Sequence, residues 1–308
     1  MTPLRQAVAD YLTMRRGLGF KLQRAGSLLP DFVAHLERCH APTVTRNLAL
    51  EWAMRPPGAH PAWWVTRLEV VRGFARYLQA FDPSTEVPAP ELLRGRYRRK
   101  APYLYSQGDI DRLFEAIRQL CSPQRAATLN TLIGLLAVAG LRVGEAIRLD
   151  REDVDWIQRL LMIRESKFGK SREVPLHEST VEALRAYARL RDRIFGRATT
   201  PAFFVSTTGT RLFHANINKA FQHALRDAGL QPRSTGRRPR FHDFRHTFAI
   251  TTLLAWYRAG EDVDARLPQL STYLGHVDPA ATYWYLSASP ELLAQTARRL
   301  EQATETLR

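Results

Sequence analysis

The chain has 308 residues, 45% of them hydrophobic, which is enough length and apolar content for two packed domains. Its 45 lysines and arginines against 30 acidic residues give a formal charge of +15, which favours a nucleic-acid partner over the alternative of a merely well-solvated surface. Two cysteines exclude a disulfide framework, and the longest apolar run, residues 131–141, is too short for a bilayer, so we expect a cytoplasmic protein with no membrane partner.

Residues 1–83 predict a helical N-terminal domain. Apolar residues recur at three-to-four spacing over four stretches, which prolines and glycines separate. These stretches are residues 3–17, 27–39, 45–55 and 61–81. Together they predict a small four-helix bundle. Arg72 and Arg76 share one face of its last helix and could contact a DNA groove.

Residues 84–103 predict an extended basic linker between two domains. Prolines oppose a continuous helix in this stretch, and basic residues are dense toward its end. These residues are Arg94, Arg96, Arg98, Arg99 and Lys100. Their charge suits contact with a phosphate backbone, and the alternative is a solvated hinge. The position between two domains favours DNA contact.

Residues 104–308 predict a second domain, mainly α with a small antiparallel β-sheet, which makes the chain α+β. Ser106 with Asp109 three residues later indicates a helix start. Helical patterns then cover residues 109–120, 125–140, 177–193, 214–229, 242–258, 265–274 and 290–306. Between them, residues 156–166 and 172–177 predict a β-hairpin that turns at Gly169.

Arg142 is the first candidate for chemistry. It follows Gly140 at the end of an apolar helix, and Glu145 lies one helical turn beyond it. Glycine there permits a left-handed turn or a close backbone approach, which would present Arg142 from a rigid start point. The alternative is an ordinary surface arginine with an acidic partner.

Two further clusters carry cations and histidines. Lys167 and Lys170 flank the hairpin tip, where a lysine can reach into a site but is more often solvated. His242 and Arg245 lie three residues apart on one helical face. An arginine-rich stretch precedes them, in which Arg237 and Arg238 are expected to contact DNA phosphates. His242 and His246 have the spacing of a zinc pair, but the neighbouring cations oppose a metal, so we expect His246 to be a packing or supporting residue.

Residues 271–287 form the fourth cluster of candidate site residues and contain three tyrosines. Gly275 predicts the end of a helix just before His276, and Asp278 with Pro279 predicts the start of another. The tyrosines are Tyr273, Tyr283 and Tyr285. Tyrosines at such spacing are more often core or interface residues than nucleophiles.

Taken together, the four clusters contain cations, proton-transfer groups and a phenol, without a carboxylate cluster for a metal. Arginine forks match the non-bridging oxygens of a phosphodiester and would neutralise the charge that grows on phosphorus. A phenol of ordinary pKa about 10 needs such a setting, or a nearby base, in order to attack at neutral pH. The set therefore predicts metal-independent phosphoryl transfer with no cofactor.

Residues 104–290 resemble the tyrosine recombinase (phage integrase) family. Five motifs occur in order: "GLRVGE", "KFGKSREVPL", "HDFRH", "LGHVD" and the tyrosine at position 285. The resemblance implies a DNA strand transferase that forms a 3′-phosphotyrosyl link and releases a 5′-hydroxyl. It also implies a tetramer on two duplexes, with the N-terminal bundle and the catalytic domain closing around DNA.

The resemblance also implies a role for each matched residue. Arg142 and Arg245 would hold the scissile phosphate, with Glu145 supporting the site. Lys167 would protonate the leaving 5′-oxygen, His242 would accept or donate a proton, and His276 would hydrogen-bond the phosphate. The nucleophile of the family usually lies nine residues beyond the histidine of "LGH", which selects Tyr285. Tyr283, two residues away, would then point elsewhere and pack.

Two alternatives remain for the activity: a type IB topoisomerase, and a non-catalytic DNA-binding accessory subunit of a recombinase system. The sequence leaves the DNA site open, as well as the choice between integration, excision and resolution. It also leaves open the identity of any mobile element and whether partner recombinases take part. The last predicted helix carries an apolar stripe that would allow packing on a neighbouring subunit or on its own domain.

Overall fold

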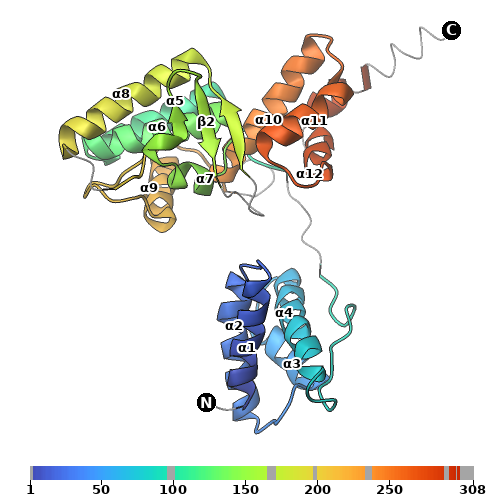
Figure 1. Ribbon diagram of the computed structural model, residues 1–308. Coiled ribbons are helices and arrows are strands. Elements are labelled where there is room, and N and C mark those ends of the chain that lie inside the picture. Colours follow the sequence, from blue (N-terminus) through green and yellow to red (C-terminus); the bar gives the residue numbers. More distant parts are fainter. Residues whose placement is uncertain are drawn as a thin grey trace, which may run out of the picture. The chain divides into compact units, whose positions relative to one another are not determined.

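The computed structural model describes residues 3–95, 101–164, 171–196, 200–232, 238–287, 291–295 and 297–298. The chain divides into two compact units, Met1–Arg99 and Lys100–Arg308 (Figure 1). In the described residues, no helix combines the length and the apolar character that a membrane crossing requires.

Unit 1 is a bundle of four helices. They are α1 (Pro3–Gly17), α2 (Gln23–Arg38), α3 (Arg46–Met54) and α4 (Pro61–Gln79). Their apolar faces meet around Phe32, Trp52 and Phe74, which are fully buried. All four predicted helices are present, but α2 begins four residues before its expected start. Its buried stripe extends back to Ala25, which lies ahead of the stretch whose periodicity had indicated the helix.

The chain beyond α4 stays attached to the bundle before it leaves unit 1. Glu86 donates its backbone N–H to the carbonyl of Val44 at 2.8 Å. Arg72 on α4 donates through Nε to the Pro88 carbonyl at 2.8 Å and through Nη2 to the Ala89 carbonyl at 3.0 Å. The guanidinium of Arg72 therefore holds the first part of the predicted linker in place.

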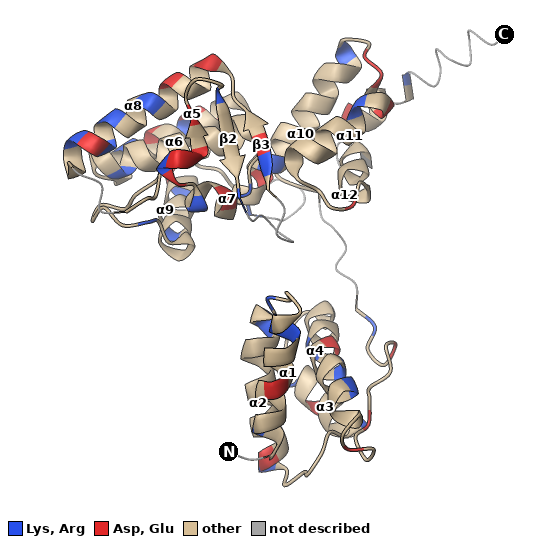
Figure 2. Cartoon of the chain, in the orientation of Figure 1, with Lys and Arg blue, Asp and Glu red and all other residues tan. Residues whose placement is uncertain are grey.

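The other predicted DNA-contacting residues of this region differ in their surroundings. Arg76 on α4 and Arg94 beyond it are exposed, and the blue colour of basic residues marks α4 and the segment after it (Figure 2). Four residues lie outside the described residues: Arg96, Arg98, Arg99 and Lys100.

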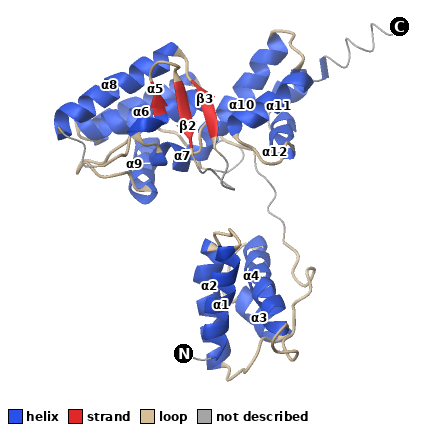
Figure 3. Cartoon of the chain, viewed as in Figure 1, coloured by secondary structure: helices blue, strands red, loops and turns tan. Residues whose placement is uncertain are grey.

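Unit 2 combines helices with one small sheet, which confirms the predicted fold class (Figure 3). Its described helices are α5 (Gln107–Leu120), α6 (Pro123–Ala139), α7 (Val143–Arg148), α8 (Glu178–Phe195), α9 (His214–Asp227), α10 (Phe241–Arg258), α11 (Val263–Leu274) and α12 (Ala280–Tyr283). Its antiparallel strands are β1 (Val154–Asp155), β2 (Leu160–Ile163) and β3 (Arg172–Pro175), in the order β1-β2-β3. Leu161 lies opposite Val174, so both side chains face the core.

Local signals explain where the helices of unit 2 begin and end. The predicted capping box is present at α5, where Ser106 and Asp109 exchange hydrogen bonds. Helix α6 ends at Gly140, whose φ of 58° favours glycine. A Cβ at Gly140 would lie 2.6 Å from Cδ1 of Phe248 on α10, so glycine also permits the close approach of these two helices. Both roles expected of this glycine are confirmed.

Helices α10, α11 and α12 form a second core within unit 2. They lie together beyond β3 in Figure 1 and bury Ile250, Leu253, Leu267 and Leu274. After α12 the chain continues as a 3₁₀ turn, η3 (Trp284–Ser287), rather than as the longer helix that the sequence had suggested. The "LGH" turn and η3 therefore pack directly on α10.

Candidate active site

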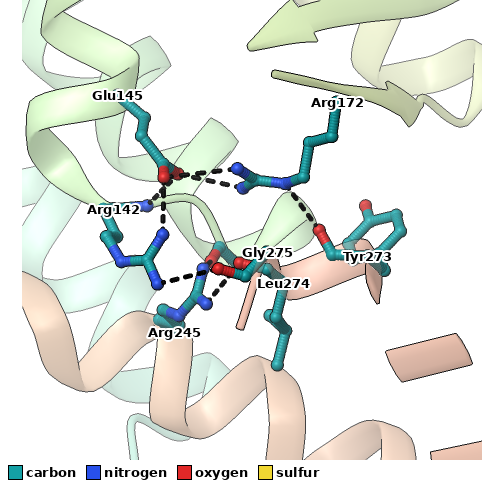
Figure 4. A network of polar contacts seen from close by, with 8 residues as sticks. Arg142, Glu145, Arg172, Arg245, Tyr273, Leu274 and Gly275 are labelled. Atoms are coloured by element: carbon teal, nitrogen blue, oxygen red, sulfur yellow. Dashed lines mark hydrogen bonds and ion pairs between the residues drawn. The ribbon is translucent and has the colours of Figure 1, made fainter. Parts of the chain in front are cut away.

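Two arginines meet where three helices begin or end (Figure 4). Arg142 lies at the start of α7, and Arg245 lies in the second turn of α10 with 1% of its surface exposed. Arg245 donates to the carbonyl of Gly140 at 2.9 Å and to the carbonyl of Leu274. Arg142 donates to the carbonyl of Gly275 at 3.3 Å. Both guanidinium groups thus hold the end of α11.

A buried carboxylate orients these cations. Oε1 of Glu145 accepts from Nη1 of Arg142 at 2.7 Å, and Oε2 accepts from the Arg142 backbone N–H at 3.0 Å. Arg172 on β3 forms a fork on the same carboxylate, with Nη1 at 3.3 Å and Nη2 at 3.0 Å. Burial alone would raise the pKa of Glu145, but the hydrogen bonds and charges of Arg172 and Arg142 lower it to about 2. Glu145 is therefore ionised at neutral pH.

Arg172 is the site residue that the sequence reasoning missed. Only 10% of its side chain is exposed, and its Nε donates to the carbonyl of Tyr273 at 2.8 Å. A Cβ at Gly275 would come within 2.8 Å of its Nη1, so the glycine leaves room for this guanidinium. The available signal was its position, since it opens the strand that follows the hairpin lysines.

The network carries more positive than negative charge. Three guanidinium groups, those of Arg142, Arg172 and Arg245, surround the one carboxylate of Glu145. Burial, followed by the charge of Arg142, lowers the pKa of Arg245 to about 10. A bound anion would offset both effects, because a negative charge stabilises the charged guanidinium. The arrangement therefore suits a phosphate.

His276 lies just beyond the helix-ending Gly275, whose φ is 66°, as predicted for a cap at this position. Its Nδ1 is 2.7 Å from Oγ1 of Thr282, a side chain with 1% exposure. This contact leaves Nε2 as the ring nitrogen that can meet a ligand. Burial and then the charges of Arg245 and Arg142 lower the pKa of His276 to about 4, so the ring is neutral at pH 7.

Tyr285 lies on η3 and is 2% exposed. Its hydroxyl is 3.3 Å from Nδ1 of His246, and its ring stacks at 6.2 Å from the ring of His276. Tyr283 is 50% exposed, so the expectation that it packs was wrong, whereas Tyr273 stacks on Phe248. Of the three tyrosines, Tyr285 therefore lies against both histidines.

The remaining predicted residues fall into two groups. His242 is exposed on α10, with its ring centroid 4.6 Å from that of His246, and Arg238 is exposed ahead of α10. Lys167, Lys170 and Arg237 lie outside the described residues. No group of three His, Cys, Asp or Glu side chains suited to a metal occurs in the part of the chain that the structure describes.

Sequence comparisons find related proteins along the whole chain. Residues 105–291 match the Phage integrase family. A putative integrase/recombinase of Sinorhizobium fredii, y4rB, is 48% identical to this chain over 99% of both lengths. A second protein of the same organism, y4rE, is 38% identical over 96% of this chain and 95% of its own. A tyrosine recombinase XerC from Alcanivorax borkumensis is 26% identical over 74% of this chain and 69% of its own length.

Solved structures share the fold at low sequence identity. A lambda integrase tetramer bound to a Holliday junction matches with a TM-score of 0.65 and 17% identity, covering 92% of this chain and 76% of that chain. The Tn1549 transposon integrase, in complex with transposon right end DNA, matches with a TM-score of 0.65 and 15% identity, covering 96% and 98%.

Proposed function

The chain belongs to the phage integrase family of tyrosine recombinases, and on this premise we propose that it cleaves and rejoins DNA at specific recombination sites through a 3′-phosphotyrosyl intermediate. The observation that carries the proposal is the excess positive charge of the Arg142, Arg172 and Arg245 network beside His276, against whose ring the buried Tyr285 stacks. A scissile phosphodiester is the anion that this network would bind.

In the proposed reaction, Arg142 and Arg245 hold the two non-bridging oxygens of the phosphate. Arg142 uses some of its five N–H donors on Glu145 and on a protein carbonyl, and Arg245 uses some of its own on two carbonyls. These bonds fix the plane of each guanidinium and leave further donors for the substrate. Preoriented cations of this kind stabilise the charge that develops on phosphorus without a rearrangement at the moment of reaction.

The other groups act on the atoms that bond or leave. In this scheme the Thr282 hydroxyl donates to Nδ1 of His276, so the neutral ring carries its proton on Nε2 and donates it to the phosphate. Tyr285 attacks phosphorus, and we assign to Lys167 the protonation of the leaving 5′-oxygen. The phosphotyrosyl link conserves the energy of the broken ester, so the reaction as proposed requires neither ATP nor a metal ion.

Trapping of the covalent intermediate tests this function. A suicide substrate, nicked so that the fragment with the 5′-hydroxyl escapes, should leave the wild-type chain covalently bound to DNA in the presence of EDTA. Strand exchange between two duplexes then separates a recombinase from a type IB topoisomerase, which would only relax supercoils. Failure of the wild type to form the adduct on the end sequences of its own element would favour the accessory-subunit alternative.

We also propose that unit 1 and the stretch 94–100 hold double-stranded DNA in the cytoplasm, and that the chain self-associates on it as a tetramer. The lambda integrase neighbour, a tetramer on a Holliday junction, supports this assembly. The predicted helix 290–306, which the structure describes only in part, would contact the adjacent subunit. Partner recombinases remain a further option for the assembly.

Arg76 and Arg72 offer a matched test of DNA contact. Arg76→Ala should weaken DNA binding at every sequence and lower the salt slope of log K by about 1, because an exposed arginine releases a counterion when it meets a phosphate. Arg72→Ala should instead destabilise unit 1 by roughly 1–3 kcal/mol, since its guanidinium satisfies two carbonyls. Salt titrations of binding and urea unfolding measure the two effects. If Arg72→Ala lowered the salt slope and Arg76→Ala destabilised unit 1, Arg72 would be the phosphate contact.

A further inference from the structure

We infer that His246 is the catalytic base of this site, taking the proton of the Tyr285 hydroxyl through Nδ1 as the phenol attacks. The inference rests on the proposed function, since it concerns the same reaction. It assigns to the second histidine of "HDFRH" a proton transfer that the sequence alone had offered to His242.

The geometry places an acceptor directly on the nucleophile. Nδ1 of His246 is 3.3 Å from the hydroxyl oxygen of Tyr285, and the two rings meet edge to face with centroids 5.5 Å apart. A base must lie within hydrogen-bond reach of the proton it removes, about 2.6–3.2 Å between heavy atoms, and such contacts are often longer in a chain without substrate. The contact at 3.3 Å is only slightly longer than this reach. His246 is thus positioned to act on the reacting atom itself.

The surroundings hold this pair together. The His246 ring lies 4.6 Å from the ring of His242 and 5.3 Å from that of Trp284. Tyr285 is 2% exposed, so bulk water has little access to its hydroxyl, whereas His242 is on the exposed side of α10. Because His246 follows Arg245 on α10, one helix presents both the phosphate-binding cation and the proton acceptor.

The proposed step balances in both directions. The O–H bond of Tyr285 breaks, its proton moves to the lone pair on Nδ1, and a new bond forms between the phenol oxygen and phosphorus. The bond from phosphorus to the 5′-oxygen breaks, and that oxygen takes a proton from the separate donor assigned to Lys167. In religation the 5′-hydroxyl returns its proton to the donor assigned to Lys167 as its oxygen bonds to phosphorus. The bond from phosphorus to the phenol oxygen breaks, and that oxygen recovers its proton from His246.

Other titratable and charged groups face the pair and must stay unchanged in a test. His242 lies on the same helix as His246. His276, from the turn after α11, stacks on Tyr285, the other member of the pair. The charge of Arg245 also interacts with Tyr285, and Arg142 and Arg172 act on His276. A single substitution at His246 leaves all of these groups in place.

His246→Asn tests the inference, because the amide oxygen of asparagine can stand near the position of Nδ1 and accept the hydrogen bond without accepting the proton. The rate of adduct formation is measured from pH 6 to 9.5 on the suicide substrate. The wild-type rate should level off once the imidazole is neutral. The variant should be slower by about 10²–10⁴-fold at pH 7 and should keep rising with pH, since its phenol must ionise unaided.

A substrate with sulfur in place of the bridging 5′-oxygen separates a base from an acid. A thiolate leaves without a proton, so this substrate should restore a variant that lacks the acid but should not restore His246→Asn. DNA binding of the variant should equal that of the wild type. The rate of the matched variant His242→Asn, whatever its absolute value, should still level off as the pH rises.

Four results would overturn the inference. A wild-type pH profile in His246→Asn, or its rescue by the sulfur substrate, would show that His246 does not remove the phenolic proton. A lost plateau in His242→Asn alone would assign the base to His242. Absence of any adduct with the wild type would overturn the proposed function and this inference with it. Failure of the inference alone would leave the wild-type adduct intact, so the two failures are distinguishable.

Discussion

Replacement of Tyr285 by phenylalanine is expected to abolish the covalent protein–DNA adduct, with cleavage reduced by at least about 10⁴-fold because no other group supplies the attacking oxygen. The phenylalanine ring fills the same buried space, so the fold should lose polar contacts of the hydroxyl, such as the hydrogen bond with His246, which is worth about 1 kcal/mol. Denaturing gel electrophoresis of the suicide-substrate reaction measures the adduct. Unchanged DNA binding would show that the loss is chemical.

Tyr283→Phe is the matched control for this variant. Tyr283 lies two residues away and is half exposed, so its hydroxyl is expected to be dispensable and adduct formation should stay within about twofold of the wild type. The reverse result, an adduct from Tyr285→Phe and none from Tyr283→Phe, would contradict the choice of nucleophile. It would also require η3 to rearrange on DNA, because Tyr283 does not share the buried position of Tyr285.

Local sequence patterns predicted most of the helices because each carries its own signal. The capping box at Ser106 and the left-handed glycines at Gly140 and Gly275 depend on residues within a few positions of one another. The start of α2 was misplaced because its first turn carries few apolar residues. The continuation of α12 was misjudged because a 3₁₀ turn and an α-helix have similar short-range patterns.

The site was less predictable, since its contacts join distant parts of the chain. Arg172 binds Glu145 across 27 positions, and Arg142 reaches Gly275 across 133. No periodicity encodes such pairs. The family resemblance supplied candidate roles for the matched motif positions. It did not indicate that Arg172 binds Glu145 or that His246 contacts Tyr285.

Tyr285 illustrates how the two kinds of information combine. Spacing from His276 selected it among three tyrosines, and helix geometry predicted that Tyr283 would point elsewhere. The structure places these residues on a short helix and a 3₁₀ turn, and the side chains still differ, one buried and one half exposed. The choice of Tyr285 as the nucleophile therefore rests on its spacing from the histidine of "LGH" rather than on the expected helix.

Glu145→Gln is expected to lower the free energy of unfolding of unit 2 by about 3 kcal/mol at pH 7. The side chain of Glu145 is 1% exposed and is the carboxylate shared by Arg142 and Arg172. Glutamine keeps the shape but removes the charge, which leaves two guanidinium groups close together without their counter-ion. Cleavage should also fall, because both arginines lose the contact that orients them.

Urea titration with hydrogen exchange in α6 peptides reports unit 2 separately from unit 1. Glu152→Gln is the matched control, since Glu152 forms a solvent-exposed ion pair with Arg164 and its loss should cost less than about 1 kcal/mol.

The stability deficit of Glu145→Gln should depend on pH with a defined sign. Folding lowers the pKa of Glu145 to about 2 from an ordinary value near 4.3, so between these values the unfolded chain binds the additional proton. The stabilisation by Glu145 is therefore complete above about pH 5 and is lost as the pH falls toward 2. Wild type and variant should converge over that interval. A deficit that stays constant down to pH 2 would show that the packing of the side chain, and not its charge, holds the arginines in place.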